Sequence, residues 1–166
     1  MLRVDHAGET AAVKIYEGQL AVMGNSPLTR RTAAKIRHMA AQEEEHLALF
    51  DEMLPARDVR PTVMNPLWNV AGFALGAVTA LIGEKAAMAC TEAVEEVIDE
   101  HYAGQIAELG DDEPELSETL ERLRAEEAEH RQTAIDEGAQ EAPGHSLLTG
   151  VIKAGCRAAI KISERV

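Results

Sequence analysis

Apolar residues recur every three or four positions through most of the chain, with polar residues between them. This spacing places the apolar side chains on one face of a helix, so it predicts a series of amphipathic helices. Clusters of glycine, proline and aspartate separate the periodic segments. The expected helices cover about 4–23, 28–54, 84–109, 115–140 and 146–164, and an uncharged segment over 61–83 joins the second to the third.

Four of these helices place a glutamate on the apolar face, where burial is expected. In the second and fourth of these helices, a histidine follows one turn later on the same face. The neighbouring acidic residues, Glu44 and Glu45 in QEEEHLALF and Glu126 and Glu129 in AEEAEH, fall off that face. The residues on the apolar faces are Glu9, Glu43, His46, Glu95, Glu127 and His130.

The chain contains two copies of one unit, a glutamate, a turn and Glu-x-x-His, over 1–54 and again over 84–140. In each helical hairpin the two glutamates lie at similar distances from the turn, so antiparallel pairing brings them to one level. Four ionised carboxylates cannot be buried together without positive charge, which two divalent cations would supply. Carboxylate and imidazole ligands suit iron or manganese. The pattern predicts an all-α, ferritin-like four-helix bundle, a single domain over 1–166, with a dinuclear metal site.

Composition narrows the class of protein further. Aromatic residues make up 3% of the chain, and the Ala, Leu and Glu content favours helices over sheets. The net charge of −13 argues against nucleic acid as a partner. Cys90 and Cys156 form neither a disulfide framework nor a zinc spacing, and we expect them to be packing residues. The first residues lack the apolar core of a secretion signal, which favours an intracellular location.

The segment 61–83 contains no charged side chain and is long enough to cross a bilayer. A single crossing would put Glu43 and Glu95 on opposite sides of the membrane, so we expect a long crossover helix along the bundle instead. Its apolar surface has two interpretations, packing wholly on the bundle or lying in a membrane interface. The C-terminal helix is amphipathic and fits either anionic lipid headgroups or an ordinary solvated face. Its basic residues are Lys153, Arg157, Lys161 and Arg165.

Six segments carry a resemblance to a known family: RVDHAGE, QEEEHL, RPTVMNPLWNVAGFALGA, ACTEAVEEVIDEHY, EEAEH and AGCRAAIKISER. Together they resemble the demethoxyubiquinone hydroxylases of ubiquinone biosynthesis. The resemblance implies a membrane-associated di-iron monooxygenase that hydroxylates a 2-polyprenyl-3-methyl-6-methoxy-1,4-benzoquinol with O2. It implies two iron ions, with terminal, bridging and imidazole ligands in pairs: Glu9 and Glu95, Glu43 and Glu127, and His46 and His130.

Further residues enter through the same resemblance. His101 and Tyr102 match a His-Tyr pair with an expected role in electron or proton transfer, and core packing is the alternative for Tyr102. Glu100 stands where the family pattern has another histidine, which leaves the surroundings of that pair open. We expect the polyprenyl tail between the crossover and its neighbouring helices, along an apolar wall formed by Leu67, Trp68, Phe73 and Leu75.

The expected location is peripheral, on the cytoplasmic face of a bacterial inner membrane, with the matrix face of the mitochondrial inner membrane as the alternative. The polyprenyl quinol and membrane lipids are the expected partners. The sequence leaves open the electron donor, either NADH directly or a reductase, together with any protein partner in ubiquinone biosynthesis and any homo-oligomer. Two other functions compete with this one. They are a ferritin-like iron-storage or peroxidase protein, and a non-enzymatic lipid- or quinone-binding bundle with one structural ion.

Overall fold

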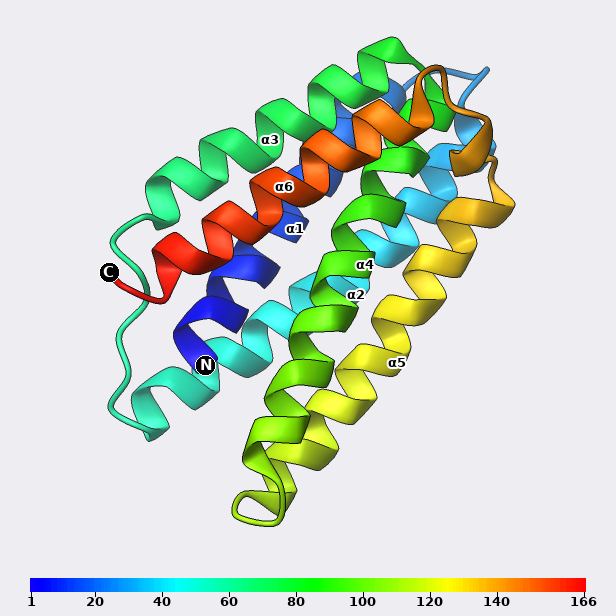
Figure 1. Ribbon diagram of the computed structural model, residues 1–166. Coiled ribbons are helices and arrows are strands. Elements are labelled where there is room, and N and C mark those ends of the chain that lie inside the picture. Colours follow the sequence, from blue (N-terminus) through cyan, green and yellow to red (C-terminus); the bar gives the residue numbers. More distant parts are fainter.

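Six α-helices and one short 3-10 helix make up the chain, and there are no strands (Figure 1). The computed structural model describes residues 1–166. The helices are α1 (Leu2–Met23), α2 (Arg30–Ala56), α3 (Asn65–Ile82), α4 (Glu84–Leu109), α5 (Pro114–Asp136) and α6 (His145–Ser163), and the 3-10 helix is η1 (Ala139–Glu141). The prediction of an all-α helical bundle is confirmed.

Three helices differ in their boundaries from the sequence prediction. The helix expected over 28–54 begins at Arg30 and continues through Pro55, which the last turn accommodates. The crossover is helical only from Asn65, because Pro66 suits a first helical turn, where no amide donor is needed. The helix expected over 115–140 ends at Asp136, since Gly138 adopts a left-handed φ of 90° and η1 follows.

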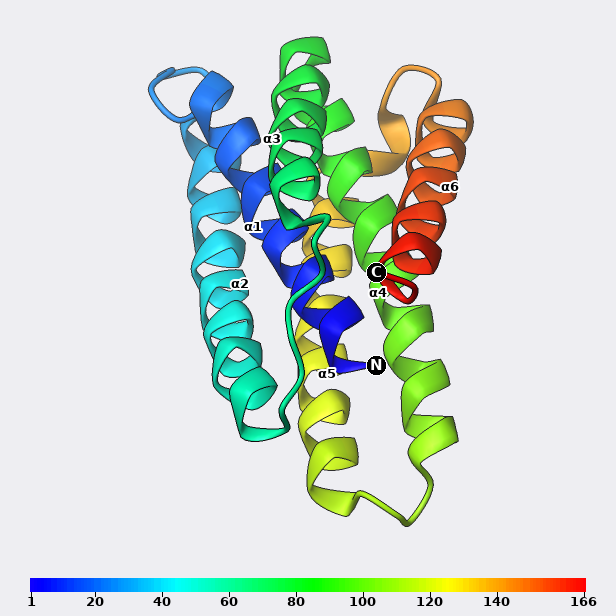
Figure 2. The ribbon, with the colours of Figure 1, turned by 90° about the vertical axis from the view of Figure 1, so that its left-hand side faces the viewer.

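Two helical hairpins form the centre of the molecule. The first hairpin pairs α1 with α2, and the second pairs α4 with α5. The crossover α3 packs along α1 and α6 packs along α4, so both lie on the side of the α1–α4 pair that faces away from α2 and α5 (Figures 1 and 2). The helices α1 and α4 therefore have two covered faces, one toward α2 and α5 and one toward α3 and α6.

Glycines allow α3 to lie very close to α1. A Cβ atom at Gly76 would lie 1.9 Å from the carbonyl oxygen of Ile15, and one at Gly72 would lie 2.7 Å from that of Ala11. Gly18 of α1 makes the matching approach, because its Cβ would lie 2.2 Å from the Phe73 carbonyl oxygen. By length and composition alone α3 could cross a membrane. In this fold its glycine face is held against the bundle.

The opposite face of α3 has no protein covering it. Together with the outer face of α6 it presents a set of exposed apolar side chains: Leu67, Val70, Phe73, Val78, Leu81 and Ile82 of α3, and Leu147, Val151 and Ile162 of α6. The crossover is thus not packed wholly on the bundle. Isolated exposed apolar residues are ordinary, but a helix face as rich in them as that of α3 marks an interaction surface. We call this set the outer apolar face.

The basic residues of α6 do not all project freely from the protein. Lys153 pairs with Glu96 of α4, and Arg157 Nη2 lies 2.8 Å from Glu100 Oε2. Glu100, the departure from the family pattern, is therefore an exposed partner of α6. Lys161 and Arg165 are exposed. The interpretation of α6 as a free basic surface is consequently limited to these last two residues.

Candidate metal centre

Four helices contribute inward-facing acidic and histidine side chains to the middle of the bundle. Each of these side chains lies on the helix face that its apolar neighbours bury, as the sequence spacing requires. All six residues predicted as ligands are 2% exposed or less. They are Glu9 from α1, Glu43 and His46 from α2, Glu95 from α4, and Glu127 and His130 from α5.

The ligand atoms of these residues fall into two overlapping groups, each with atoms within 4.8 Å of one another. One group adds Glu9 and His46 to a shared pair of glutamates, and the other adds Glu95 and His130 to the same pair. The shared pair is Glu43 and Glu127. This arrangement provides two adjacent cation positions that have two carboxylates in common.

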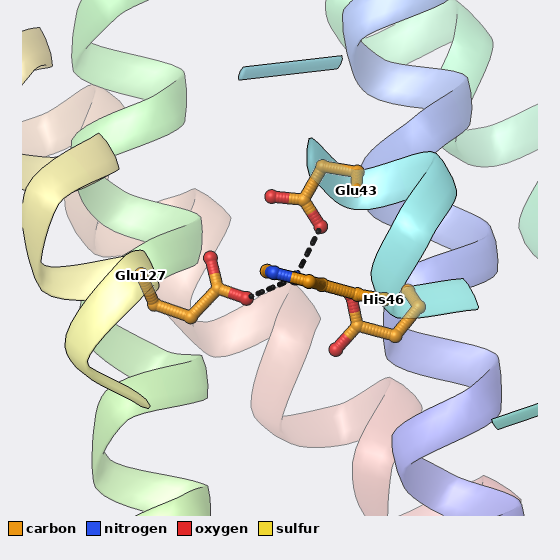
Figure 3. A group of neighbouring side chains, drawn as sticks. Glu43, His46 and Glu127 are labelled. Carbon is orange, nitrogen blue, oxygen red and sulfur yellow. Dashed lines mark ion pairs between the residues drawn. The ribbon is translucent and has the colours of Figure 1, made fainter. Parts of the chain in front are cut away.

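Both imidazoles turn the same nitrogen toward the shared carboxylates. His46 Nδ1 lies 3.1 Å from Glu127 Oε1 and 3.8 Å from Glu43 Oε2, as Figure 3 shows. His130 Nδ1 lies 2.9 Å from Glu43 Oε1 and 3.1 Å from Glu127 Oε2. The Nε2 atoms of both rings point outward and contact other side chains. This placement leaves Nδ1 as the ligand atom of each histidine.

The cluster contains buried polar atoms that lack a well-directed hydrogen bond within the protein, although some of them lie in ion-pair contact with one another. Six such atoms converge here: Glu9 Oε2, Glu43 Oε1 and Oε2, His46 Nδ1, Glu95 Oε2 and Glu127 Oε1. Each buried atom without a partner costs about 1–3 kcal/mol, so this concentration calls for a cation between them. The donors are carboxylate oxygen and imidazole nitrogen with no thiolate, which suits a divalent metal such as iron or manganese. The residues present therefore fit a dinuclear metal site.

The carboxylates disfavour one another strongly when no cation lies between them. Burial and the charge of Glu127 raise the pKa values of Glu43 and Glu95 well above their ordinary range. Burial lowers the pKa of His46, but hydrogen bonds to Glu127 and Glu9 outweigh it and raise the pKa to about 11. These shifts favour the protonated forms of all three groups in the metal-free cluster, and a binding cation would compete with those protons.

Glu127 behaves differently from the other two carboxylates. Burial raises its pKa, but hydrogen bonds to His130 and His46 outweigh that effect and lower the pKa to about 2. Glu127 therefore remains ionised and pairs with both imidazoles. It is the natural first anchor for a cation in the cluster.

Two tyrosines hold the glutamates that the cation positions do not share. Tyr16 donates a hydrogen bond of 2.7 Å to Glu95 Oε1, and Tyr102 donates one to Glu9 Oε1. Both tyrosines are 1% exposed. The sequence placed both on core faces but gave Tyr16 no role. The signal was present in the spacing, because Tyr16 follows Glu9 at the interval at which Tyr102 follows Glu95.

Two polar residues contact the outward nitrogens of the histidines. Glu126 Oε2 lies 2.6 Å from His46 Nε2, and Gln42 Oε1 lies 3.2 Å from His130 Nε2. Sequence analysis placed Glu126 off the apolar face and missed its contact with His46. It is half-buried, at the edge of that face, rather than fully solvated.

His101 lies outside the metal cluster, in a polar network near the start of α1. Its Nε2 atom is 3.1 Å from Asp5 Oδ1, and Gln105 donates a 2.6 Å hydrogen bond to the same oxygen. His6 contacts Asp51 at 3.0 Å. The network adjoins the metal cluster because Tyr102, next to His101 in the chain, reaches Glu9.

A groove of about 380 Å³ lies between α1, α3, α4 and α6, and most of its lining is apolar. Trp68 and Leu75 line it, whereas Leu67 and Phe73 project to the outer apolar face. The helical period separates these two pairs, so only half of the expected apolar wall faces the groove. Gly8 and Val94 also line the groove and directly precede Glu9 and Glu95. The groove thus runs along the backs of the two helices that carry these ligands.

A protein-family model described as "Ubiquinone biosynthesis protein COQ7" matches residues 1–163. This chain belongs to the COQ7 family. The resemblance inferred from the motifs is thereby confirmed. The family model covers nearly the whole chain, including all six residues of the buried cluster of glutamates and histidines.

Named relatives of the COQ7 family match the whole chain. The 3-demethoxyubiquinol 3-hydroxylase of Rhodospirillum rubrum is 58% identical over 99% of this chain and 76% of its own length. The human "NADPH-dependent 3-demethoxyubiquinone 3-hydroxylase, mitochondrial" is 48% identical over 100% of this chain and 76% of its own. The Saccharomyces cerevisiae "5-demethoxyubiquinone hydroxylase, mitochondrial" is 38% identical over 100% and 77%.

The variant Glu43→Gln tests whether the buried Glu43 carboxyl destabilises the metal-free protein and whether a bound cation removes that cost. The amide has the same shape but no charge, so we expect metal-free E43Q to be more stable than the metal-free wild type, by about 1–3 kcal/mol at pH 7. Because the folded-state pKa of Glu43 is raised, this advantage should grow as pH rises above the carboxyl's unfolded pKa and vanish below it. Thermal denaturation across pH measures it.

Divalent metal should raise the melting temperature of the wild type and leave that of E43Q nearly unchanged. The matched control is Glu44→Gln, which removes an exposed charge next in the chain and should follow the wild type. Equal stabilisation of E43Q and wild type by metal would contradict this assignment of Glu43.

Proposed function

We propose that this chain hydroxylates the ring of a demethoxyubiquinol with O2, at two iron ions held by the six buried ligands. The observation that carries the proposal is the pair of cation positions sharing Glu43 and Glu127 beneath an apolar groove. Relatives from bacteria, animals and yeast, named as hydroxylases of demethoxyubiquinol or demethoxyubiquinone, support it.

The reaction replaces one ring C–H bond of the quinol by C–OH. One oxygen atom of O2 enters the product, and the other leaves as water with two protons and two electrons from a donor. Two iron ions, when bound, supply the reduction of O2 and the transfer of its oxygen atom. The protein supplies the ligands, the placement of the ring and the exclusion of bulk water.

The roles of the protein side chains follow from their contacts. Glu43 and Glu127 hold both cation positions at a fixed separation, since each belongs to both ligand groups. Tyr16 and Tyr102 restrain Glu95 and Glu9 by hydrogen bonds, so these carboxylates would be held in one orientation toward a bound ion. Every one of these groups is buried, which keeps competing water away from the ligands.

The groove is the proposed site for the polyprenyl tail. Its lining of about 20 residues is largely aliphatic, and Ile15, Leu75 and Val97 are typical members. Each methylene group buried there contributes about 0.8 kcal/mol to binding. Trp68 Nε1 donates a 3.0 Å hydrogen bond to Ser163 Oγ, which ties α3 to the end of α6 at the groove. A tail held between these helices places the quinol ring beside α1 and α4, the helices that carry Glu9 and Glu95.

The outer apolar face is the proposed surface for peripheral attachment to a membrane. It lies on the two helices that flank the groove, so a tail dissolved in lipid reaches the groove without crossing water. Such a surface belongs on the cytoplasmic face of the inner membrane in bacteria. Animal relatives are named as mitochondrial, which supports the mitochondrion as the corresponding location in eukaryotes.

A reduced nicotinamide nucleotide is the proposed source of the two electrons. Animal relatives at 48–50% identity are named NADPH-dependent, which favours a nicotinamide donor for this chain. A ferritin-like iron-storage or peroxidase protein is the competing function. Such a protein would need no apolar groove, and its relatives would not be named as hydroxylases of a quinol or quinone. The groove and the names of the relatives therefore both favour the hydroxylase.

Turnover of the predicted substrate is the direct test of this function. Iron-loaded protein with a nicotinamide reductant, O2 and a polyprenyl demethoxyquinone should give a product one oxygen atom heavier, detected by mass spectrometry. Glu127→Gln should abolish the product by removing an anion common to both cation positions. Glu129→Gln, which removes an exposed charge from the same helix, should retain activity. Iron oxidation with no hydroxylated product would favour the storage or peroxidase function.

Filling the groove tests the proposed site of the tail. A Cβ atom at Gly155 meets nothing within 4 Å, so the backbone there accepts a side chain, and Gly155→Phe introduces bulk at the groove. We expect the KM for a long-tailed substrate to rise at least about tenfold, because losing the burial of two methylene groups costs about 1.6 kcal/mol. A substrate with a truncated tail should be turned over as by the wild type.

Gly150→Phe is the matched control, since Gly150 lies on the exposed side of the same helix, also in open space, and does not line the groove. Steady-state kinetics with both substrates separates the cases. Equal effects of the two variants, or equal effects on both substrates, would remove the groove from the proposal.

A further inference from the structure

The residues around the metal ligands repeat between the two halves of the chain, and their contacts cross from one half to the other. Tyr16 of the first half donates a hydrogen bond to Glu95 of the second half, and Tyr102 of the second half donates one to Glu9 of the first half. The two cation positions are therefore related by an approximate two-fold symmetry that includes their hydrogen-bond partners.

The partners of the two histidines obey the same rule. Gln42 and Glu126 directly precede the shared glutamates of their own halves. Gln42 contacts His130 of the second half, and Glu126 contacts His46 of the first. The positions are equivalent, but the side chains are not, because one is a neutral amide and the other a carboxylic acid.

The contact made by Glu126 is the stronger of the two. Its Oε2 lies 2.6 Å from His46 Nε2, against 3.2 Å between Gln42 Oε1 and His130 Nε2. Glu126 Oε1 also accepts a 3.1 Å hydrogen bond from Arg122, which favours the ionised carboxylate. A carboxylate accepting the Nε2 proton makes the opposite nitrogen, Nδ1, a better electron donor and fixes the ring toward the metal.

A second break in the symmetry falls on the same cation position. Asp5 precedes Glu9 at the interval at which Thr91 precedes Glu95. Each is contacted by a glutamine from the opposite half, Asp5 by Gln105 at 2.6 Å and Thr91 by Gln19 at 3.4 Å. An acidic residue thus replaces a neutral one again, beside Glu9. Glu126 contacts His46, and Asp5 lies one helical turn before Glu9, so each added acidic group is associated with a residue of the same cation position.

We propose that Glu126 is a positioning residue that makes the two metal positions unequal, so that the position formed by Glu9 and His46 binds a divalent cation more tightly and fills first. The neutral amide of Gln42 leaves the position formed by Glu95 and His130 as the weaker one. The inference rests on the metal site of the proposed function and not on the quinol reaction. It stands even if no hydroxylated product forms.

Anaerobic titration of the metal-free protein with Co²⁺, followed by its visible absorption, tests this inequality. The wild type should bind two ions with distinct affinities. Glu126→Gln should weaken the tighter phase by about 10–100-fold, the usual cost of removing such a partner of a metal-bound histidine. The affinities of the two binding phases should then become more similar. Gln42→Glu should instead tighten the weaker phase, bringing the two affinities together from the other side.

Glu129→Gln controls for the loss of charge, because Glu129 is exposed on the same helix and contacts neither histidine. Its two affinities should match those of the wild type. A single phase in the wild type, unchanged affinities in E126Q, or an equal loss in E129Q would each overturn the proposal. Should E126Q fail to fold by circular dichroism, Q42E decides alone, and unchanged affinities there would overturn it.

Discussion

The burial of four carboxylates at one level of a helical bundle is the constraint on which the rest of this structure depends. Protein groups alone leave six of the buried polar atoms there without a well-directed hydrogen bond, and burial together with the charge of Glu127 raises the pKa values of Glu43 and Glu95. Two cations would relieve both problems, because they would neutralise the negative charge and bind the buried polar atoms that lack hydrogen bonds. Ligand identity, helix pairing and the tyrosine contacts all serve that single arrangement.

The helices α1 and α4 connect the metal centre to the surface. One face of each carries a glutamate of the buried cluster, Glu9 or Glu95, and the opposite face lines the apolar groove beneath α3 and α6. Glycine contacts hold α3 against α1, so the groove has a firm wall although the outer apolar face is uncovered. An apolar tail and a charged metal centre would thereby share two helices without sharing an environment.

The sequence predicted the bundle, the six buried ligand-type side chains and the crossover, because helical periodicity and hairpin symmetry determine which residues face inward. It did not predict the contact of Glu126 with His46, since a half-buried residue at the edge of a helix face looks solvated in a periodic pattern. Nor did it separate Trp68 from Leu67, because hydrophobicity alone does not show which face of α3 meets the bundle. The pairing of Lys153 and Arg157 with α4 required the packing of α6 to be known.

The proton release that accompanies metal binding tests the central electrostatic claim most directly. In weakly buffered solution near neutral pH, filling both positions of the metal-free protein with a divalent cation should release protons from the cluster. They come from Glu43, Glu95 and His46, the groups whose pKa values the metal-free cluster raises. Binding of two cations with no release of protons, or no binding at all, would contradict the account.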